Sequence, residues 1–330
     1  MGSGDRLTFG SLFAGVGGFD LGLEAAGWEC AWQVEWEPNC QQTLGYWWPG
    51  VPRWGDVTTV SGSVLPPVDV IVFGSPCQDL SLAGKRAGLE GDRSGLFFEA
   101  TRIIQEMKDE STGTFPRLAV WENVPGALTS TNGDDFEAVL TEMAKLGASF
   151  IEWAVLDARY FGVPQRRRRL FLVAIFDPDL GERMPEQLFA LGDRSARDTS
   201  PSGQTQQGLA TDVTGSPDDA GTIFSFDTQF GSNANVFVNM APTLKSTQQP
   251  PSISDGTTVR RLTPVECERL MGWPDDHTLY RADGKTNSDT ARYKMCGNGV
   301  ASPVAQWIAE QINKADRRPM EEDDGQPSEA

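Results

Sequence analysis

Histidine and paired cysteines are almost absent from this chain. Its 330 residues include one histidine, His277, and five cysteines that form no Cys-x-x-Cys pair. Zinc sites draw on clusters of histidine and cysteine, and Ser-His or Cys-His catalysis needs a histidine beside its nucleophile. The sequence therefore argues against a metal site and against both forms of histidine-dependent catalysis. Because His277 follows the polar stretch Pro274-Asp275-Asp276, we expect its side chain at the surface.

Long hydrophobic runs are also missing. No stretch of eighteen apolar residues occurs, and the first six residues have neither the basic nor the apolar part of a secretory signal. A hydrophobic content of 39% with ordinary charge density is typical of a globular protein with one large domain, or a large and a small one. We predict a cytoplasmic protein with no membrane partner.

Positive charge is in deficit, since the formal net charge is −18. Binding to nucleic acid needs a basic surface that neutralises phosphates, so this charge by itself argues against such a partner. The distribution weakens the objection, because the acid gathers in places such as residues 321–324, while Lys85, Arg86 and Arg93 share one loop and residues 166–169 are all arginine. Both basic segments could still be ordinary solvated faces.

Apolar runs of strand length alternate with amphipathic helical segments through the first half of the chain. The strand-like runs are residues 7–13, 30–35, 68–73, 118–121, 152–157 and 170–175. Such alternation predicts a doubly wound α/β sheet with helices on both faces. Residues 178–258 are richer in small and polar residues, which indicates a second, smaller, loop-rich domain. A capping box at Thr263-Pro264-Val265-Glu266 then predicts the start of another helix.

A cysteine lies just beyond one of these strands. Pro76-Cys77-Gln78 follows the run at 68–73 and opens a Gly-rich, basic loop over residues 74–95. Ligands gather at the carboxyl ends of parallel strands, so Cys77 is placed for nucleophilic chemistry. A buried structural cysteine is the alternative. Glu122 follows the next strand, and we therefore expect its carboxylate and the Cys77 thiol to face one pocket.

A second group of residues indicates a nucleoside cofactor. The turn Phe13-Ala14-Gly15-Val16-Gly17-Gly18 follows the first strand, and Glu35 ends the second. Glycines let the backbone approach a ligand closely, and an acid on the next strand can accept hydrogen bonds from ribose hydroxyls. Trp36 offers a flat face for adenine, and Asp56 could reach its amino group. Purely structural glycines remain an alternative, because the turn lacks the G-x-G-x-x-G spacing of dinucleotide sites.

Taken together, these residues resemble the DNA cytosine C5 methyltransferases, in the family's order and over nearly the whole chain. The matching motifs are Phe13-x-Gly15-x-Gly17-Gly18, Pro76-Cys77-Gln78, Glu122-Asn123-Val124, Gln165-x-Arg167-x-Arg169, the run from Arg261 to Gly272, and Gly297-Asn298-Gly299-Val300. The resemblance implies a Rossmann-like methyltransferase fold that uses S-adenosylmethionine and acts on a flipped-out cytosine in double-stranded DNA. It places a catalytic domain at 5–177 plus 288–315, a target-recognition domain at 178–287 and an acidic disordered tail at 316–330.

The resemblance also assigns roles to individual residues. Cys77 would add to C6 of cytosine, Glu122 would hold N3 and the exocyclic amine, and Arg167 and Arg169 would fix the base and Glu122. The implied cofactor contacts are Phe13, Gly15, Gly17, Gly18, Glu35, Trp36, Asp56, Val57, Pro76, Leu96, Asn298 and Val300. The implied DNA contacts are Gln78, Ser81, Lys85, Arg93, Gln165, Thr243 and Leu244.

Several alternatives stay open on the sequence alone. An RNA cytosine C5 methyltransferase, a catalytically silent DNA-binding relative and a nicotinamide oxidoreductase are the competing functions. The last leaves Cys77 and Glu122 without a role, and intact Cys77, Glu122 and Arg169 argue against a silent relative. The presence of every motif in one chain indicates a monomer. The expected location is the cytoplasm of a prokaryotic or phage-infected cell. A cognate restriction endonuclease is an open question, and so is the target sequence.

Overall fold

A computed structural model describes residues 6–75, 95–190, 223–226, 236–246, 250–254 and 258–316. Several predicted features lie outside these residues. They are the Pro76, Cys77, Gln78, Ser81, Lys85 and Arg93 sites and nearly all of the acidic tail, of which residue 316 alone is described.

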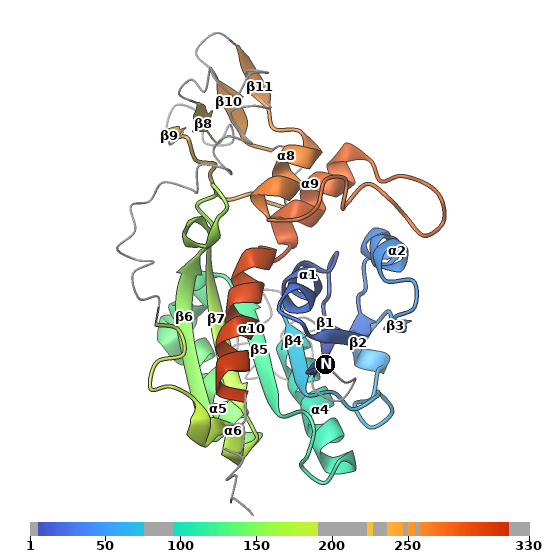
Figure 1. The fold of residues 1–330 in the computed structure, drawn as a ribbon, viewed down its shortest axis with the longest axis vertical. Helices are drawn as coiled ribbons and strands as arrows, with labels where there is room; N and C mark the ends of the chain where they lie inside the picture. Colours follow the sequence, from blue (N-terminus) through green and yellow to red (C-terminus); the bar gives the residue numbers. More distant parts are fainter. Residues whose placement is uncertain are drawn as a thin grey trace, which may run out of the picture.

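A seven-stranded mixed sheet forms the centre of the molecule (Figure 1), in the order β3-β2-β1-β4-β5-β7-β6. The strands are β1 (Thr8–Leu12), β2 (Glu29–Val34), β3 (Arg53–Trp54), β4 (Val70–Phe73), β5 (Leu118–Asn123), β6 (Phe150–Asp157) and β7 (Arg168–Ile175). Neighbouring strands from β3 to β5 run parallel, whereas β7 is antiparallel to both β5 and β6. The predicted α/β fold with a doubly wound mixed sheet is confirmed.

Helices cover both faces of this sheet. The helices are α1 (Gly18–Ala25), α2 (Pro38–Trp47), α4 (Leu96–Glu110), α5 (Asp134–Lys145), α6 (Pro178–Arg183), α8 (Pro264–Leu270), α9 (Asp289–Asn298) and α10 (Ser302–Asp316). Alternate strand residues point to opposite faces, so Val70 and Val72 pack in one core with α1 and α10, while Ile71 and Phe73 pack in another with α4 and α5. Fully buried strands explain why the runs read as continuous hydrophobic sequence.

The reversal of β7 decides which residues meet at the functional edge. The carboxyl ends of β1, β2, β4 and β5 lie at one edge of the sheet, and because β7 runs the other way, its amino end lies there too. Asn123, at the end of β5, pairs with Leu170 near the start of β7. The arginines just before Leu170 are thereby brought to the edge where Glu122 lies.

A smaller antiparallel sheet stands apart from the first one (Figure 1). Its order is β11-β10-β8-β9, with β8 (Phe224–Phe226), β9 (Val236–Val238), β10 (Ser252–Ser254) and β11 (Val259–Arg261). Helix α8 follows β11, and Thr263 and Glu266 form the predicted capping box at its start. Helix α6 packs against α10 and β7 of the larger sheet, although it belongs to the predicted polar region.

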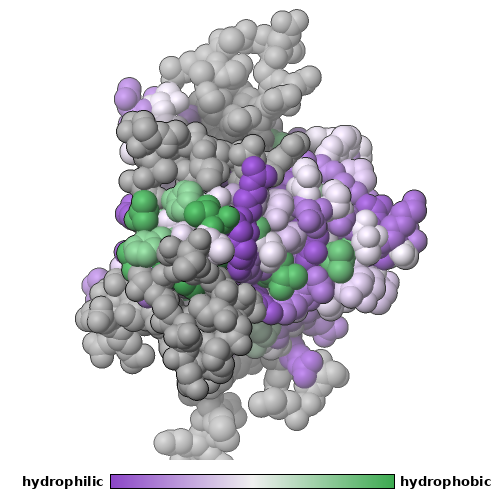
Figure 2. Space-filling view, turned by 90° about the horizontal axis from the view of Figure 1, so that it is seen from above, coloured by the Kyte–Doolittle hydropathy of each residue, from purple (hydrophilic) through white to green (hydrophobic). Residues whose placement is uncertain are grey.

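The surface expectation for His277 is wrong. His277 is 0% exposed and therefore contributes nothing to the surface. The described surface in Figure 2 is mostly hydrophilic, with small groups of hydrophobic residues. The segment after α8 turns inward, and the imidazole ring packs against Trp47, Trp48 and Trp273. Packing against residues distant in the sequence has overridden the polar local composition.

Candidate active site

A cavity of about 520 Å³ lies at the carboxyl edge of the large sheet and joins the two predicted halves of the site. One side is lined by Phe13, Gly15, Val16, Glu35, Glu37, Asn39 and Cys40. The other side is lined by Gly74, Ser75, Glu122, Asn123, Val124, Arg169 and Ser246. Helix α9 and the turn after it complete the wall with Ala291, Lys294, Met295, Gly297, Asn298 and Gly299.

Glu122 and Arg169 form an ion pair in the second half of the cavity. Arg169 Nε lies 3.1 Å from Glu122 Oε1, and Glu122 is only 8% exposed. Burial raises the pKa of the Glu122 carboxyl, and the positive charges of Arg169 and Arg167 act in the opposite direction. A carboxyl group with a raised pKa can hold a proton near neutral pH and donate it in a hydrogen bond.

The chain leading to Cys77 is fixed beside this pair. Trp121 Nε1 donates to Ser75 Oγ at 3.0 Å, and Asn123 Nδ2 donates to the Ser75 carbonyl oxygen at 3.1 Å. Ser75 is buried and is the last described residue before the loop. The end of β5 therefore anchors the chain two residues before Cys77. Cys77 itself lies outside the described residues.

Glu35 organises the first half of the cavity. Its Oε2 accepts a hydrogen bond from the backbone N–H of Gly15 at 2.7 Å, and its Oε1 accepts one from that of Glu37 at 2.7 Å. Burial raises the pKa of the Glu35 carboxyl, while these two N–H donors lower it. Gly15 has φ 58° and a Cβ built there would meet no atom within 4 Å, so the turn presents bare backbone to open space.

The other predicted cofactor residues fall into three groups. Phe13 and Asn298 line the cavity, and Pro76 lies outside the described residues. The remaining ones are not among the cavity's lining residues: Gly17, Gly18, Trp36, Asp56, Val57, Leu96 and Val300. Trp36 is 71% exposed, and the Asp56 carboxylate caps a short 3₁₀ helix by accepting from the Thr58 N–H. No contact in the structure tests the predicted roles of these residues in binding adenine.

Arg167 is placed differently from Arg169. It is one of the largest fully buried side chains, and its guanidinium donates to the carbonyl oxygens of Leu244, Gly297 and Gly299 at 3.2, 2.9 and 2.6 Å. These carbonyls occupy its terminal nitrogens, and it does not line the cavity. The geometry therefore differs from the predicted direct role beside the base. It indicates that Arg167 joins the turn after α9 to residue 244.

The predicted DNA residues near this joint are buried or bonded to it. Gln165 is 0% exposed, donates to the Leu270 carbonyl oxygen at 3.0 Å and pairs with Ala241 in an isolated bridge. Thr243 is half-buried, and its hydroxyl donates to the Arg166 carbonyl oxygen, while Leu244 is 3% exposed. Of these predicted DNA contacts, Thr243 is the one placed to reach a partner without rearrangement.

Sequence reasoning identified Asn298 on α9 but missed Lys294 and Ala291. Lys294 and Ala291 line the cavity together with Asn298, and Lys294 Nζ lies 3.1 Å from Glu37 Oε2 across it. The spacing of four residues between Lys294 and Asn298 places both on one face of a helix. That spacing was available in the sequence and could have added Lys294 to the predicted Asn298.

Metal-ligating clusters and membrane-spanning helices are both absent from the described residues. No group of three or more His, Cys, Asp or Glu side chains in that part of the chain is arranged to hold a metal ion. Among the same residues, no helix is long and apolar enough to cross a bilayer.

Comparison with known proteins identifies the family. The model of the C-5 cytosine-specific DNA methylases matches residues 7–194 and 222–314. The chain is 31% identical to Type II methyltransferase M.BsuFI of Bacillus subtilis, over 93% of this chain and 72% of that protein. It is 30% identical to Type II methyltransferase M.HhaI of Haemophilus parahaemolyticus, over 94% of this chain and 95% of that one.

A solved structure shares the fold. The Dnmt2 methyltransferase of S. pombe superposes with a TM-score of 0.62 and 14% identity, over 94% of this chain and 100% of that one. Sequence and fold therefore agree with the geometry of the cavity: the chain belongs to the C-5 cytosine-specific DNA methylases and is a DNA (cytosine-5-)-methyltransferase.

Proposed function

We propose that this enzyme transfers the methyl group of S-adenosylmethionine to C5 of a cytosine that has been flipped out of double-stranded DNA. The observation that carries the proposal is the single cavity lined both by Glu35 and Gly15 and by Glu122 and Arg169. A nucleoside-binding half and an acid–arginine half in one cavity are what methyl transfer to a base requires, because donor and acceptor must lie in contact.

The first half of the cavity suits the adenosine part of S-adenosylmethionine. Glu35 is held by two backbone N–H donors, and each carboxylate oxygen keeps a second lone pair that can accept from a ribose hydroxyl. The open space at Gly15 gives the ligand access to the backbone. We assign Glu35, Gly15, Phe13 and Asn298 to this role. When bound, S-adenosylmethionine would supply an electrophilic methyl group.

The second half of the cavity suits a cytosine ring. Cytosine C5 is a poor nucleophile, so we propose that the Cys77 thiolate adds to C6 and forms a C–S bond, which moves electron density to C5. Glu122, whose pKa burial raises, would donate a proton to N3 and neutralise the charge that develops there. After methylation of C5, the C5 proton is lost to solvent, the Cys77 thiolate departs and N3 returns its proton to Glu122, which restores the neutral aromatic ring.

Arg169 acts on this step through Glu122. Its Nε–Oε1 contact of 3.1 Å fixes the carboxyl orientation. Its Nη1 donates to the Arg168 carbonyl oxygen at 2.9 Å, which leaves the Nη2 N–H groups available to a base oxygen. Arg167 would instead stabilise the cavity wall by donating hydrogen bonds to the carbonyl oxygens of Gly297 and Gly299.

The smaller sheet and the segments around it form the proposed target-recognition part. It joins the body through Gln165 and Arg167, directly beside the cavity wall. We propose that this part contacts the duplex in the major groove and that Thr243 contacts the strand near the extruded base. Since one chain supplies the residues of both halves of the cavity, we propose that the enzyme acts as a monomer.

The decisive experiment compares two cysteines in a methyl-transfer assay. Transfer of labelled methyl from S-adenosylmethionine to unmethylated duplex DNA is measured for the wild type, Cys77→Ser and Cys40→Ala. Cys40 also lines the cavity, but burial raises the pKa of its thiol well above the usual value, so it stays protonated and unreactive. We expect Cys77→Ser to abolish transfer and Cys40→Ala to retain it.

Bisulfite sequencing of the product tests the position of the label and the target sequence together. Label at cytosine C5 in one DNA context supports the proposal. Transfer to transfer RNA alone, measured in parallel, would replace DNA by RNA as the substrate. Full activity of Cys77→Ser would refute the covalent step.

A further inference from the structure

We propose that His277 is a positioning residue for cofactor binding, which holds the Phe13–Gly18 turn in its binding conformation through the Val16 carbonyl group. This inference rests on the proposed S-adenosylmethionine site. His277 lies outside that cavity and outside the catalytic groups described above.

The imidazole makes one polar contact, and that contact reaches the cavity wall. His277 Nε2 lies 2.7 Å from the Val16 carbonyl oxygen, and Val16 lines the cavity. A carbonyl oxygen can only accept, so the ring nitrogen facing it carries the proton. In the neutral ring Nδ1 is then unprotonated, and it has no hydrogen-bond partner among the described residues. A buried ring nitrogen without a partner costs free energy, and the Nε2 hydrogen bond to Val16 is the polar contact that offsets part of this cost.

Three tryptophans fix the orientation of the ring. Trp47 stacks on it with ring centroids 5.2 Å apart and an interplanar angle of 24°. Trp48 meets it edge-on at 6.2 Å, and Trp273 lies tilted at 5.5 Å. Indole rings on these sides leave the imidazole little freedom to rotate. The Nε2–H is thereby aimed at Val16 without further loss of side-chain entropy.

The same tryptophans support the turn itself. A Cβ built at Gly17 would lie 2.4 Å from Trp48, and one built at Gly18 would lie 3.2 Å from Trp273, so both rings press directly on the turn. Phe13, Gly15 and Gly17 all have positive φ, at 54, 58 and 83°. Glycine adopts positive φ freely, but the αL conformation of Phe13 persists only when surrounding contacts hold it. At the Val16 carbonyl, the hydrogen bond from outside the turn is the one from His277.

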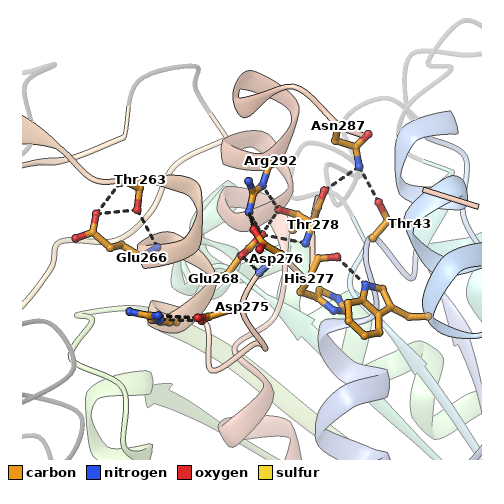
Figure 3. Close-up of polar contacts among 12 residues, drawn as sticks. Thr43, Thr263, Glu266, Glu268, Asp275, Asp276, His277, Thr278, Asn287 and Arg292 are labelled. Carbon is orange, nitrogen blue, oxygen red and sulfur yellow. Dashed lines mark hydrogen bonds and ion pairs between the residues drawn. The ribbon is translucent and has the colours of Figure 1, made fainter. Parts of the chain in front are cut away.

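His277 and its neighbours belong to a network of hydrogen bonds and ion pairs (Figure 3). The His277 carbonyl oxygen accepts from Trp47 Nε1 at 2.7 Å. Figure 3 shows Glu268, Asp276 and Arg292 meeting beside it, and Arg292 Nη2 lies 2.9 Å from Glu268 and 3.0 Å from Asp276. Arg292 belongs to α9, which lines the opposite wall of the cavity. Through this network, His277 connects the turn on one side of the cavity to the helix on the other.

Two variants separate the hydrogen bond from the packing. His277→Gln places an amide N–H close to where Nε2 lies, whereas His277→Leu fills similar volume with no donor. We expect His277→Leu to raise the dissociation constant of S-adenosylmethionine about 10-fold in calorimetry, and His277→Gln to stay within about 3-fold of the wild type, as the loss of one buried hydrogen bond predicts. At saturating S-adenosylmethionine, kcat should change less than twofold in both, because the bond acts on binding.

A spectroscopic measurement on the wild type gives a second readout. Since His277 is the chain's one histidine, selective ¹⁵N-histidine labelling of the tag-free protein gives the signals of a single imidazole. We expect the tautomer with the proton on Nε2, and a shift of its signals when S-adenosylmethionine is added. A proton on Nδ1, or imidazole signals that do not shift when S-adenosylmethionine is added, would overturn the inference even if a variant failed to fold.

The outcomes separate this inference from the proposed function. A wild type that binds S-adenosylmethionine, together with a His277→Leu variant that binds it equally well, overturns the positioning role alone. Equal loss of affinity and of thermal stability in the Gln and Leu variants would also overturn it, because that pattern belongs to packing. A wild type that binds no S-adenosylmethionine overturns the proposed function and this inference with it.

Discussion

Glu122 shows how opposing effects set the chemistry of one buried residue. Burial favours the neutral carboxylic acid, whereas Arg169 at 3.1 Å favours the carboxylate. Burial is the larger effect, and the pKa is raised. A group balanced in this way can give up and regain a proton at low cost, which is what stabilising charge at N3 requires.

Glu122→Gln tests this role with almost no change in shape. Glutamine keeps the volume of the side chain but cannot transfer a proton to N3. We expect kcat for DNA methylation to fall about 10²- to 10³-fold, as when one preorganised donor to a developing charge is removed. Calorimetry should give an unchanged dissociation constant for S-adenosylmethionine, because Glu35 lies in the other half of the cavity. A variant with wild-type kcat would exclude the assignment.

His277 predicts a pH dependence of stability. Burial lowers its pKa from 6.5 to about 4. Between these values the unfolded chain binds a proton that the folded chain does not, so stability rises with pH at about 1.4 kcal/mol per unit. The contribution is complete above pH 6.5 and is lost as pH falls toward 4. Below pH 4 both states bind the proton, and the dependence ends.

Urea unfolding of the wild type and His277→Gln from pH 4.5 to 7.5 measures this dependence. Glu268, Asp276 and Arg292 lie near the ring in both proteins, so the difference between the two proteins isolates the imidazole. We expect the difference in unfolding free energy to favour the wild type more as pH rises to 6.5 and then to level off. A difference independent of pH would contradict the buried neutral ring.

The positions of single residues were predictable where the local sequence determines them. They were not predictable where packing against distant parts of the chain determines them. Glu122 and Glu35 could be placed because each ends a strand, and the sheet brings strand ends together. His277 and Arg167 could not. Their neighbours in sequence are polar, and they are buried because tryptophans and carbonyl groups from other parts of the chain enclose them.

At the scale of elements, the join between α1 and the turn after α9 is tight. A Cβ built at Gly18 would lie 2.5 Å from the Val300 carbonyl oxygen and 2.9 Å from its nitrogen, both of which are backbone atoms. Backbone at this position cannot move without disturbing Gly299, which lines the cavity. The start of α1 and the cavity wall therefore both depend on the absence of a side chain at Gly18.

Gly18→Ala should accordingly damage both stability and binding. We expect it to lower the unfolding free energy by about 1–3 kcal/mol, as overpacking does, and to weaken S-adenosylmethionine binding. Gly50→Ala is the matched control, since a Cβ there meets nothing within 4 Å, and its effect should lie within about 0.5 kcal/mol. Denaturant unfolding and calorimetry measure both quantities. Equal behaviour of the two variants would show that the contact is relieved easily.

Sequence pattern located the strands of the large sheet well, and for a physical reason. The strands β1, β4, β5 and β7 are buried along most of their length, so their residues form apolar runs whose ends can be read directly. The partly exposed β6 was also predicted, whereas the two-residue β3 forms no such run and was missed. Strand direction cannot be read in this way, because hydrophobicity is the same in both directions along a strand. The antiparallel placement of β7, which brings Arg169 to Glu122, thus came from the structure.

At the scale of the whole molecule, an enzyme with net charge −18 acts on a polyanion. Long-range repulsion is reduced by salt over about 8–10 Å, so local basic groups near the strand decide binding. The division into domains stays a prediction. It has to accommodate the packing of α6, and of Leu188 and Phe189, against the larger sheet and α10.

The joint between the two sheets is the last feature that the structure makes testable. Arg167 donates to Leu244 on one side and to Gly297 and Gly299 on the other. A Cβ at Gly297 would lie 2.2 Å from the backbone of Lys245, so the two segments are in direct contact. The guanidinium fork is the group that spans them, and a lysine ammonium cannot reproduce its geometry.

Arg167→Lys should therefore lower the unfolding free energy by about 2–3 kcal/mol, the range for lost hydrogen bonds to a charged group. Arg166→Lys makes the same exchange one residue away on an exposed side chain, and its effect should lie within about 0.5 kcal/mol. Urea unfolding compares the two variants. Because the joint links the cavity wall to the recognition part, Arg167→Lys should also raise the KM values for DNA and for S-adenosylmethionine together. A rise in one KM alone would show that Arg167 supports one side and does not join the two.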